Sequence, residues 1–436
     1  MPVSVSTIKR AEAGKQVLGR TIQSLANYFQ VSIDTLINDT DAPPWIYRHL
    51  VKDMPNPCYG RDWELNHLHS VLNLALNRCA LQTLYLQGMT GAGKTSLLTT
   101  FATQLTTAGK RSLIFSCDAS TENAQSPFSM PSFIKALMSV NDTTPSHDIR
   151  HKIDLIASSA LCTLRLRQWL GNNLTQCETD TLTLLSQTRV KQLDKQVARN
   201  LLAYAHHKGV AVIVIDGAHN LPANALQFIQ LFTSCDAQQA IAFIISAQQK
   251  HAFIHPPKWL SHAHTIILKP LDPDTMVQIA NHTLLCQGKV PDKHREQTAD
   301  AITRAQGNPY FLKQLLSDLD PVVTLPDALQ HFARTCLNSM PCEVASTLKF
   351  AASLGLCFNT HQLQQFNDNE KIRAPLCVLH KMLCSGLVKQ SDEHFCFVHP
   401  LVQEALKSQT THSEFSWYTY PRHHHPNQCP NQVTSN

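Results

Sequence analysis

Residues 88–95 (GMTGAGKT) combine glycines, a lysine and a hydroxyl residue in the pattern G-x-x-x-x-G-K-[ST]. Glycines let the backbone curl so that successive N–H groups point at phosphate oxygens, and a lysine can neutralise the phosphate charge. We expect Lys94 to reach the β- and γ-phosphates of a nucleotide and the Thr95 hydroxyl to bind Mg²⁺. The alternative is a glycine-rich turn without a ligand. The predicted phosphate-binding residues are Gly88, Thr90, Gly91, Ala92, Gly93, Lys94, Thr95 and Ser96.

A single carboxylate ends the apolar run 210–216 (VAVIVID), which is typical of a buried strand. Ligands of open α/β sheets gather at the carboxyl ends of the strands, so we expect Asp216 to hold hydrated Mg²⁺, or else to cap the next turn. The following residue is Gly217, which cannot polarise an attacking water as a carboxylate would. His219 could replace that carboxylate or make only a structural contact. These residues predict nucleotide binding with slow or absent hydrolysis.

Strands and helices must position these residues, and along residues 58–270 short apolar runs alternate with longer helical patterns. Apolar runs rich in Val, Ile and Leu, without clean alternation, predict a parallel sheet covered on both faces. The chain is therefore expected to be an α/β protein. Residues 149–202 read as helices inserted between two of the strands, and later residues read as helices that end in a short hairpin. The predicted strands are 83–87, 112–116, 210–216, 240–246 and 265–268.

Composition excludes several classes of protein. The 436 residues are 43% hydrophobic and 16% charged, which is typical of a chain that buries a sizeable core. The net charge of +5 is too small to indicate nucleic acid or a membrane surface by itself. No apolar run approaches the roughly 20 residues of a membrane span, and the N-terminus lacks a secretory h-region. The 14 cysteines are scattered without a CxxC pair, so we expect reduced thiols in a cytoplasmic protein with no membrane partner.

Motifs in a fixed order resemble one family, the signal-transduction ATPases with numerous domains (STAND). These include regulatory ATPases of the maltose-activator and adenylate-cyclase-associated type, which are often grouped with AAA domains of the origin-recognition type. The resemblance rests on the opening 58–65 (CYGRDWEL), the phosphate-binding loop, Asp216, the strand and turn 266–271 (IILKPL), a GxP-like motif at 304–311 (RAQGNPYF) and a histidine motif at 397–404 (FVHPLVQE).

The resemblance implies a P-loop NTPase parallel sheet followed by a helical lid and a winged-helix domain, with ATP or ADP and Mg²⁺ as cofactors. It implies that Arg61 lies by the base or ribose and that His399 reaches the β-phosphate of ADP. It also implies that Gly307 and Pro309 bring the lid backbone against adenine. The alternatives are a salt-bridged surface arginine, an ordinary helix-breaking turn and a partly buried structural histidine. If the histidine clamp exists, ADP favours a closed form, and ATP with an input signal favours an open one.

The sequence departs from the family pattern in three ways, one of which is Gly217 in place of the acid after Asp216. The other two concern the γ-phosphate sensor and the repeat array. The fourth strand ends with Ser246 and Gln248 where the family often has an arginine that senses the γ-phosphate. Either residue could hydrogen-bond phosphate, but without the charge. No repeat array follows the winged helix, although such proteins usually carry one.

The N-terminus resembles part of a phage-repressor-type (XRE family) helix-turn-helix domain. Residues 3–15 are similar to its recognition helix, and 21–26 and 31–36 to its last two helices. Met1 falls where the first two helices should already have passed, so the remaining part need not fold by itself. Together with the missing array, this suggests a fragment of a larger regulator, or a decayed one. The residues expected to contact DNA are Ser4, Ser6, Thr7, Lys9 and Arg10.

The sequence as a whole predicts a nucleotide-gated regulator of transcription, whose partners are an adenine nucleotide, DNA, and a second copy or a signalling protein. One alternative is an AAA ATPase of a transposition or DNA-mobilisation system. The other is a protein–protein signalling scaffold without DNA contact. The predicted domains are a partial helix-turn-helix at 1–41, a linker at 42–56, the P-loop ATPase at 57–270, the lid at 271–335, the winged helix at 336–409 and a disordered tail at 410–436.

Overall fold

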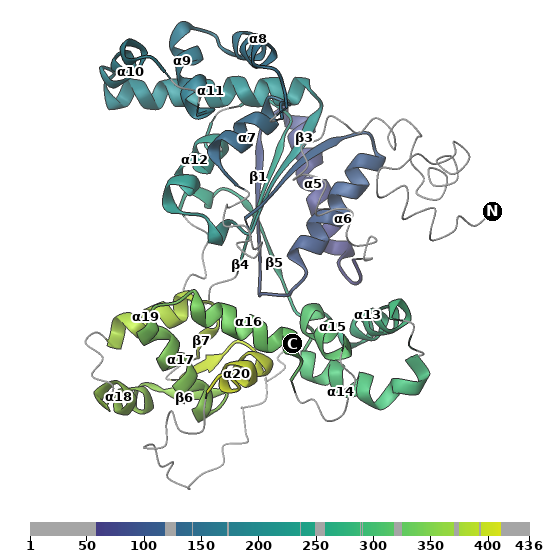
Figure 1. The fold of residues 1–436 in the computed structure, drawn as a ribbon. Coiled ribbons are helices and arrows are strands. Elements are labelled where there is room, and N and C mark those ends of the chain that lie inside the picture. The colour runs from purple at the N-terminus through teal and green to yellow at the C-terminus, as the bar shows by residue number, and fades with distance from the viewer. Residues whose placement is uncertain are drawn as a thin grey trace, which may run out of the picture. The chain divides into compact units, whose positions relative to one another are not determined.

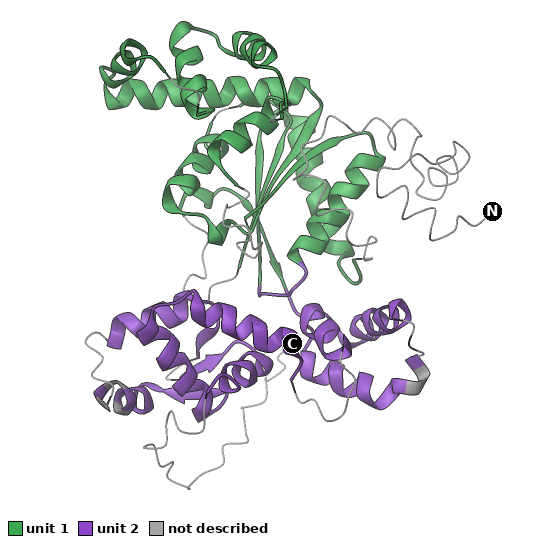
Figure 2. Cartoon of the chain, in the orientation of Figure 1, with its two compact units in different colours: residues 1–88, 94–248, 255–268 green, residues 89–93, 249–254, 269–436 purple. Residues whose placement is uncertain are grey.

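The chain divides into two compact units (Figure 2). The first consists of Met1–Gly88, Lys94–Gln248 and His255–Leu268, and the second of Met89–Gly93, Gln249–Ile254 and Lys269–Asn436. Three predicted segments lie outside the described residues: the helix-turn-helix, the linker and the tail from residue 411. The five expected DNA contacts are part of the helix-turn-helix and so lie outside as well. The computed structural model describes residues 58–117, 128–141, 143–171, 174–235, 237–248, 258–287, 289, 291–317, 325–369, 375–391 and 394–410.

A five-stranded parallel sheet forms the centre of the described part of the first unit, with the strand order β2-β3-β4-β1-β5 (Figure 1). Every residue of β3 is buried, because this interior strand carries apolar side chains toward both faces. The α/β class and the five strands predicted from the apolar runs are confirmed. The strands are β1 (Gln82–Gly88), β2 (Arg111–Ser116), β3 (Val210–Asp216), β4 (Ala242–Gln248) and β5 (His264–Leu268).

Helices cover both faces of this sheet: α5 and α6 lie on one face, and α7, α11 and α12 on the other (Figure 1). On the second face an aromatic cluster fills the core, with the Phe133 ring centroid 5.0 Å from those of both Phe115 and Phe232. The helices of the first unit are α5 (Asp62–Arg78), α6 (Lys94–Thr107), α7 (Met130–Leu137), α8 (Ser146–Ile156), α9 (Ala160–Trp169), α10 (Gln176–Thr183), α11 (Gln187–His207) and α12 (Ala223–Thr233), with short 3-10 turns η1 (Ala218–Asn220) and η2 (Lys258–Leu260).

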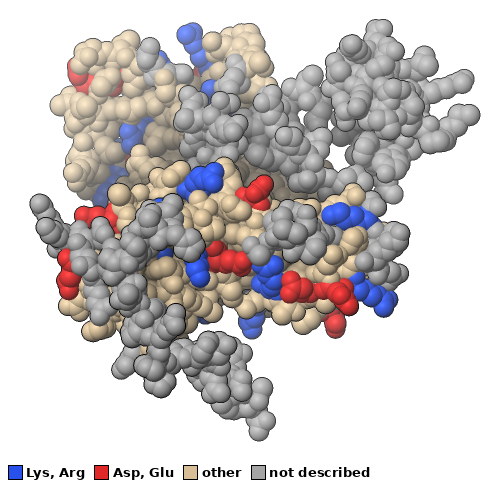
Figure 3. All heavy atoms as spheres, turned by 60° about the horizontal axis from the view of Figure 1, so that its bottom comes forward, with Lys and Arg blue, Asp and Glu red and all other residues tan. Residues whose placement is uncertain are grey.

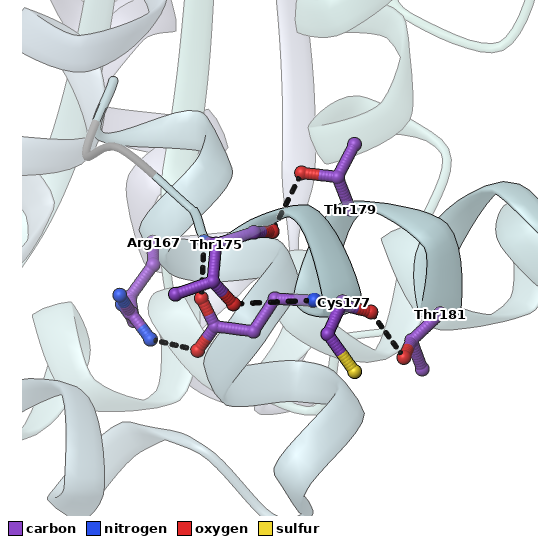
Figure 4. Close-up of polar contacts among 6 residues, drawn as sticks. Arg167, Thr175, Cys177, Thr179 and Thr181 are labelled. Carbon is purple, nitrogen blue, oxygen red and sulfur yellow. Dashed lines mark hydrogen bonds and ion pairs between the residues drawn. The ribbon is translucent and has the colours of Figure 1, made fainter.

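The helices expected between two strands are α8–α11, which lie between β2 and β3 in the chain. The first turn of α10 shows how one of these helices begins (Figure 4). The Thr175 hydroxyl accepts a hydrogen bond from the Glu178 N–H at 3.3 Å, and the Glu178 carboxylate accepts one from the Thr175 N–H at 2.8 Å. This reciprocal capping box satisfies N–H groups that a helix start leaves unpaired. The Thr175 N–H and the Arg167 guanidinium, 2.6 Å from the carboxylate, lower the pKa of Glu178.

The described part of the second unit is helical, with a three-stranded antiparallel sheet of order β6-β8-β7. From α17 to β8 the order of elements is helix, strand, two helices and a hairpin. This order is compatible with a winged helix, which stays a prediction, as do the domain boundaries. The elements are α13 (Pro273–Cys286), η3 (Pro291–His294), α14 (Arg295–Ala305), α15 (Pro309–Ser317), α16 (Asp327–Asn338), α17 (Cys342–Leu354), β6 (Cys357–Asn359), α18 (Thr360–Asn369), α19 (Pro375–Cys384), β7 (Val388–Ser391), β8 (His394–Phe397) and α20 (Pro400–Lys407).

A disulfide joins Cys357 in β6 to Cys396 in β8. The two residues are directly opposite in the antiparallel register, with their Cα atoms 4.0 Å apart. The expectation of reduced thiols is therefore wrong for this pair. The partners are 39 residues apart in sequence, and only strand pairing brings them together.

The described surface carries charges of both signs. On the face that Figure 3 shows, Lys and Arg side chains lie interspersed with Asp and Glu rather than gathered in a patch of one sign. This agrees with the small net charge of +5. Among the helices described, none combines the length and apolar character that crossing a bilayer requires.

Candidate nucleotide-binding site

Three polar side chains meet at the carboxyl ends of the strands in the first unit. The register pairs Ile215 of β3 with Ile245 of β4, so the next residues, Asp216 and Ser246, lie side by side. The Asp216 carboxylate accepts a hydrogen bond from the Thr95 hydroxyl at 2.7 Å, and its other oxygen accepts one from the Ser246 hydroxyl. The two predicted Mg²⁺ ligands, Thr95 and Asp216, are thus brought together, and neither of these contacts caps the turn that follows β3.

Lys94 bends back over the motif from the first turn of α6. Its ammonium donates a hydrogen bond to the carbonyl oxygen of Gly88 at 2.9 Å, which joins the two ends of the glycine-rich loop. The positive charge is therefore held at the loop whose glycines were expected to surround phosphate. Gly88 is buried at the end of β1, and Ser96 is exposed on α6.

Gly217 follows the carboxylate in a left-handed conformation, with φ of +81°. Its N–H donates to the Ser246 hydroxyl at 3.0 Å. Ser246 is fully buried and hydrogen-bonds both the Asp216 carboxylate and the next peptide, so it helps to orient the carboxylate. Contact of Ser246 with phosphate stays a prediction. His219 accepts a hydrogen bond at Nδ1 from the Gln248 N–H at 3.3 Å. This bond holds the imidazole against the end of β4.

Residues 89–93 of the loop belong to the second unit, where they contact the start of α15. Pro309 Cγ lies 3.8 Å from where a Cβ of Gly93 would be, so Pro309 borders the loop. The Asn308 amide donates a hydrogen bond to the carbonyl oxygen of Thr90 at 2.9 Å. The sequence motifs did not single out Asn308, which reaches the phosphate-binding loop. The available signal was an Asn directly before a Pro at a helix start, which is a common N-cap pattern.

Arg61 is 5% exposed at the start of α5 and pairs with Glu64 at 2.8 Å. Arg61 therefore forms a salt bridge, as in the alternative of a salt-bridged surface arginine, but its side chain is buried rather than on the surface. Contact with a base or ribose stays a prediction.

His399 is buried, and both ring nitrogens bond to backbone groups of the second unit. Nδ1 accepts from the Leu401 N–H at 3.1 Å, so Nε2 carries the proton and donates to the Ala305 carbonyl at 3.1 Å. The ring packs on Phe311 with centroids 4.4 Å apart, and burial lowers the pKa of His399. This geometry matches the structural alternative. Contact with a β-phosphate stays a prediction, and it requires Nε2 to exchange its Ala305 bond.

Residues 57–245 match the family model of the AAA ATPase domain. The chain contains an AAA ATPase domain. Nucleotide, typically with Mg²⁺, is what this family uses, and the residues present fit both. A hydroxyl and a carboxylate oxygen are the hard ligands that Mg²⁺ prefers, and a lysine lies at the glycine-rich loop.

Comparison with solved structures gives likenesses of low identity to this chain. The Aeropyrum pernix Orc1 protein in complex with DNA is 13% identical with a TM-score of 0.35, over 84% of this chain and 96% of that one. Cdc6p from Pyrobaculum aerophilum is 14% identical with a TM-score of 0.32, over 84% and 97%. Drosophila ORC bound to DNA is 13% identical with a TM-score of 0.36, over 83% and 91%. No curated protein matches the chain.

Proposed function

We propose that the AAA ATPase domain binds ADP or ATP with Mg²⁺ through the loop 88–96 and Asp216. The observation that carries this proposal is the 2.7 Å hydrogen bond between Thr95 and Asp216, residues 121 positions apart. Two hard oxygen ligands are already adjacent there, and Lys94 supplies a positive charge at the same loop. When bound, Mg²⁺ neutralises phosphate charge and bridges phosphate oxygens.

Hydrolysis at this site should be slow. A general base must lie within hydrogen-bond reach of the water that it activates. Gly217 supplies no side chain, and its φ of +81° disfavours any other residue at that position. The His219 nitrogen that could accept a proton, Nδ1, is already bonded to a backbone N–H. The site is therefore suited to holding nucleotide for long periods.

A nucleotide that stays bound for a long time can hold a protein in one of two conformational states. We therefore propose that the domain belongs to a nucleotide-gated regulator of the STAND type. The gate consists of the helices after residue 271, whose α15 contacts the loop through Asn308 and Pro309. In this proposal His399 and Arg61 add contacts to ADP, and ATP with an input signal opens the gate. A ligand shifts such an equilibrium only through its different affinity for the two forms.

The output of the switch is proposed to be transcription, through the partial helix-turn-helix at 1–41. A winged helix at 336–409 and assembly with a second copy or a signalling protein belong to the same proposal. A transposition-system ATPase and a signalling scaffold are the alternatives. Salt-dependent DNA binding by the full chain separates the two DNA-linked functions from the scaffold. ATPase activity that depends on a transposase would indicate the transposition system.

The proposed binding is tested by measuring nucleotide content and ADP affinity of the full chain beside Lys94→Ala. We expect the wild type to retain ADP and Lys94→Ala to lose it. Lys195→Ala is the matched control, because Lys195 is an exposed lysine on α11, remote in sequence from the loop. Equal retention by wild type and Lys94→Ala would remove the assignment of the loop.

Slow hydrolysis is tested by single-turnover measurement of bound ATP. We expect a rate well below the roughly 1 per second at the lower end of typical enzymes. A rate at or above that value would contradict the role assigned to Gly217.

A further inference from the structure

Residues 305–311 (AQGNPYF) connect three other parts of the second unit. The Ala305 carbonyl accepts from His399, and the Gly307 carbonyl accepts from the Leu271 N–H at 2.9 Å. The third connection goes to residues 89–93 of the phosphate-binding loop, which Figure 2 colours with this unit. The side chain that makes this third connection is that of Asn308, which is 6% exposed.

The oxygen and the nitrogen of the Asn308 side-chain amide bind different parts of the chain. Its oxygen accepts from the N–H groups of Tyr310 and Phe311, at 3.1 and 3.3 Å, and so caps the start of α15. Its nitrogen donates to the Thr90 carbonyl at 2.9 Å. The opposite amide orientation would set the nitrogen against two donors and the oxygen against a carbonyl, so hydrogen bonding allows only one.

The loop is shaped to receive this side chain. Gly91 has φ of +79°, and a Cβ added there would lie 2.6 Å from both Asn308 Oδ1 and Tyr310 Cβ. The Tyr310 N–H also donates to the Gly91 carbonyl, at 3.3 Å. A glycine is therefore needed at 91 for contact with α15 as well as for the curl of the loop.

These contacts use the carbonyl side of the loop, whereas phosphate is bound through N–H groups. The peptide whose carbonyl belongs to Thr90 has the N–H of Gly91 at its other end. A peptide that accepts a hydrogen bond at oxygen becomes a stronger donor at nitrogen, so the Asn308 bond and a phosphate bond reinforce each other. The two contacts therefore act on one peptide without competing for it.

We propose that Asn308 is a positioning residue for nucleotide binding, and that it couples the bound phosphate to the helices after residue 271. Its amide holds the Thr90–Gly91 peptide with the N–H toward phosphate, and its cap ties this peptide to α15. Coupling is reciprocal, so bound nucleotide must also stabilise α15. This inference rests on the proposed nucleotide binding.

Asn308→Asp in the full chain tests the coupling. An Asp keeps the acceptor that caps α15 but turns a second oxygen toward the Thr90 carbonyl in place of the donor. We expect ADP affinity to fall by about 5- to 150-fold, which corresponds to one lost hydrogen bond and one desolvated carbonyl. Hydrogen exchange of α15 should slow on adding ADP to the wild type, and should respond less at saturating ADP in the variant.

Asn200→Asp is the matched control. It adds the same charge and removes an amide donor, here to Ser158 at 3.1 Å in the first unit, and it should bind ADP as the wild type does. Asn308→Ser, which can still cap but is too short to reach Thr90, replaces the Asp variant if that fails to fold, with the same expectation.

The outcomes separate the two proposals. If the wild type binds ADP and the Asn308 variants bind it equally well, or if α15 is protected equally in all of them, the coupling is overturned and nucleotide binding stands. If wild type and Lys94→Ala bind no ADP, nucleotide binding itself fails and the coupling with it.

Discussion

Gly307 occupies a position where a Cβ atom has no room. An added Cβ would lie 2.5 Å from the Leu271 carbonyl oxygen, 2.7 Å from Pro270 Cβ and 2.9 Å from the Leu271 nitrogen. Two of these three atoms are backbone, so they cannot move away as the end of a flexible side chain would. The backbone at Gly307 also has φ of +77°, which other residues rarely adopt.

Gly307→Ala should therefore carry two separate costs. The left-handed conformation costs about 1–2 kcal/mol for a residue with a Cβ. Overpacking adds about 1–3 kcal/mol. Gly209→Ala is the control, because Gly209 has φ of +81° and nothing within 4 Å of its added Cβ, so it should show only the first cost.

Hydrogen exchange resolves the two costs because it reports local opening free energies. Peptides from α13 to α15 should lose protection in Gly307→Ala, and peptides from α11 and β3 in Gly209→Ala. The Gly307 loss should exceed the Gly209 loss by about 5- to 150-fold, the equivalent of 1–3 kcal/mol. Equal losses in the two variants would refute the argument from crowding.

Three further predictions concern other buried contacts. Because burial lowers the pKa of His399, the unfolded chain binds its proton first. The contribution of His399 to the free energy of unfolding should thus be fully present above about pH 6.5. Below that pH the free energy of unfolding should fall by up to about 1.4 kcal/mol per pH unit, and His399→Gln should reduce this slope in urea titrations. Ser246→Ala should cost about 1–3 kcal/mol in the same titrations, because it leaves the Gly217 N–H and an Asp216 oxygen without a buried partner, and a smaller loss would indicate that water replaces the hydroxyl. Reducing the Cys357–Cys396 disulfide should cost about 4 kcal/mol by loop entropy, measured by thermal unfolding with and without reductant, and an unchanged transition would contradict this value.

The sequence alone determined the features that depend on neighbouring residues. The loop 88–95, the strand that ends in Asp216 and the five apolar runs are local patterns, and the structure has a strand at each run. Such patterns predict backbone conformation and burial because glycine, β-branched and apolar residues constrain their own surroundings.

Only the tertiary structure decided which distant polar groups meet. Strand order and register place Ser246 against Asp216, a contact that the sequence did not predict. The contact of Asn308 with Thr90 spans 218 residues, and the cysteine pair spans 39. A hydrogen bond or a disulfide requires a few ångströms and a direction. Both follow from how elements pack rather than from the residues beside them.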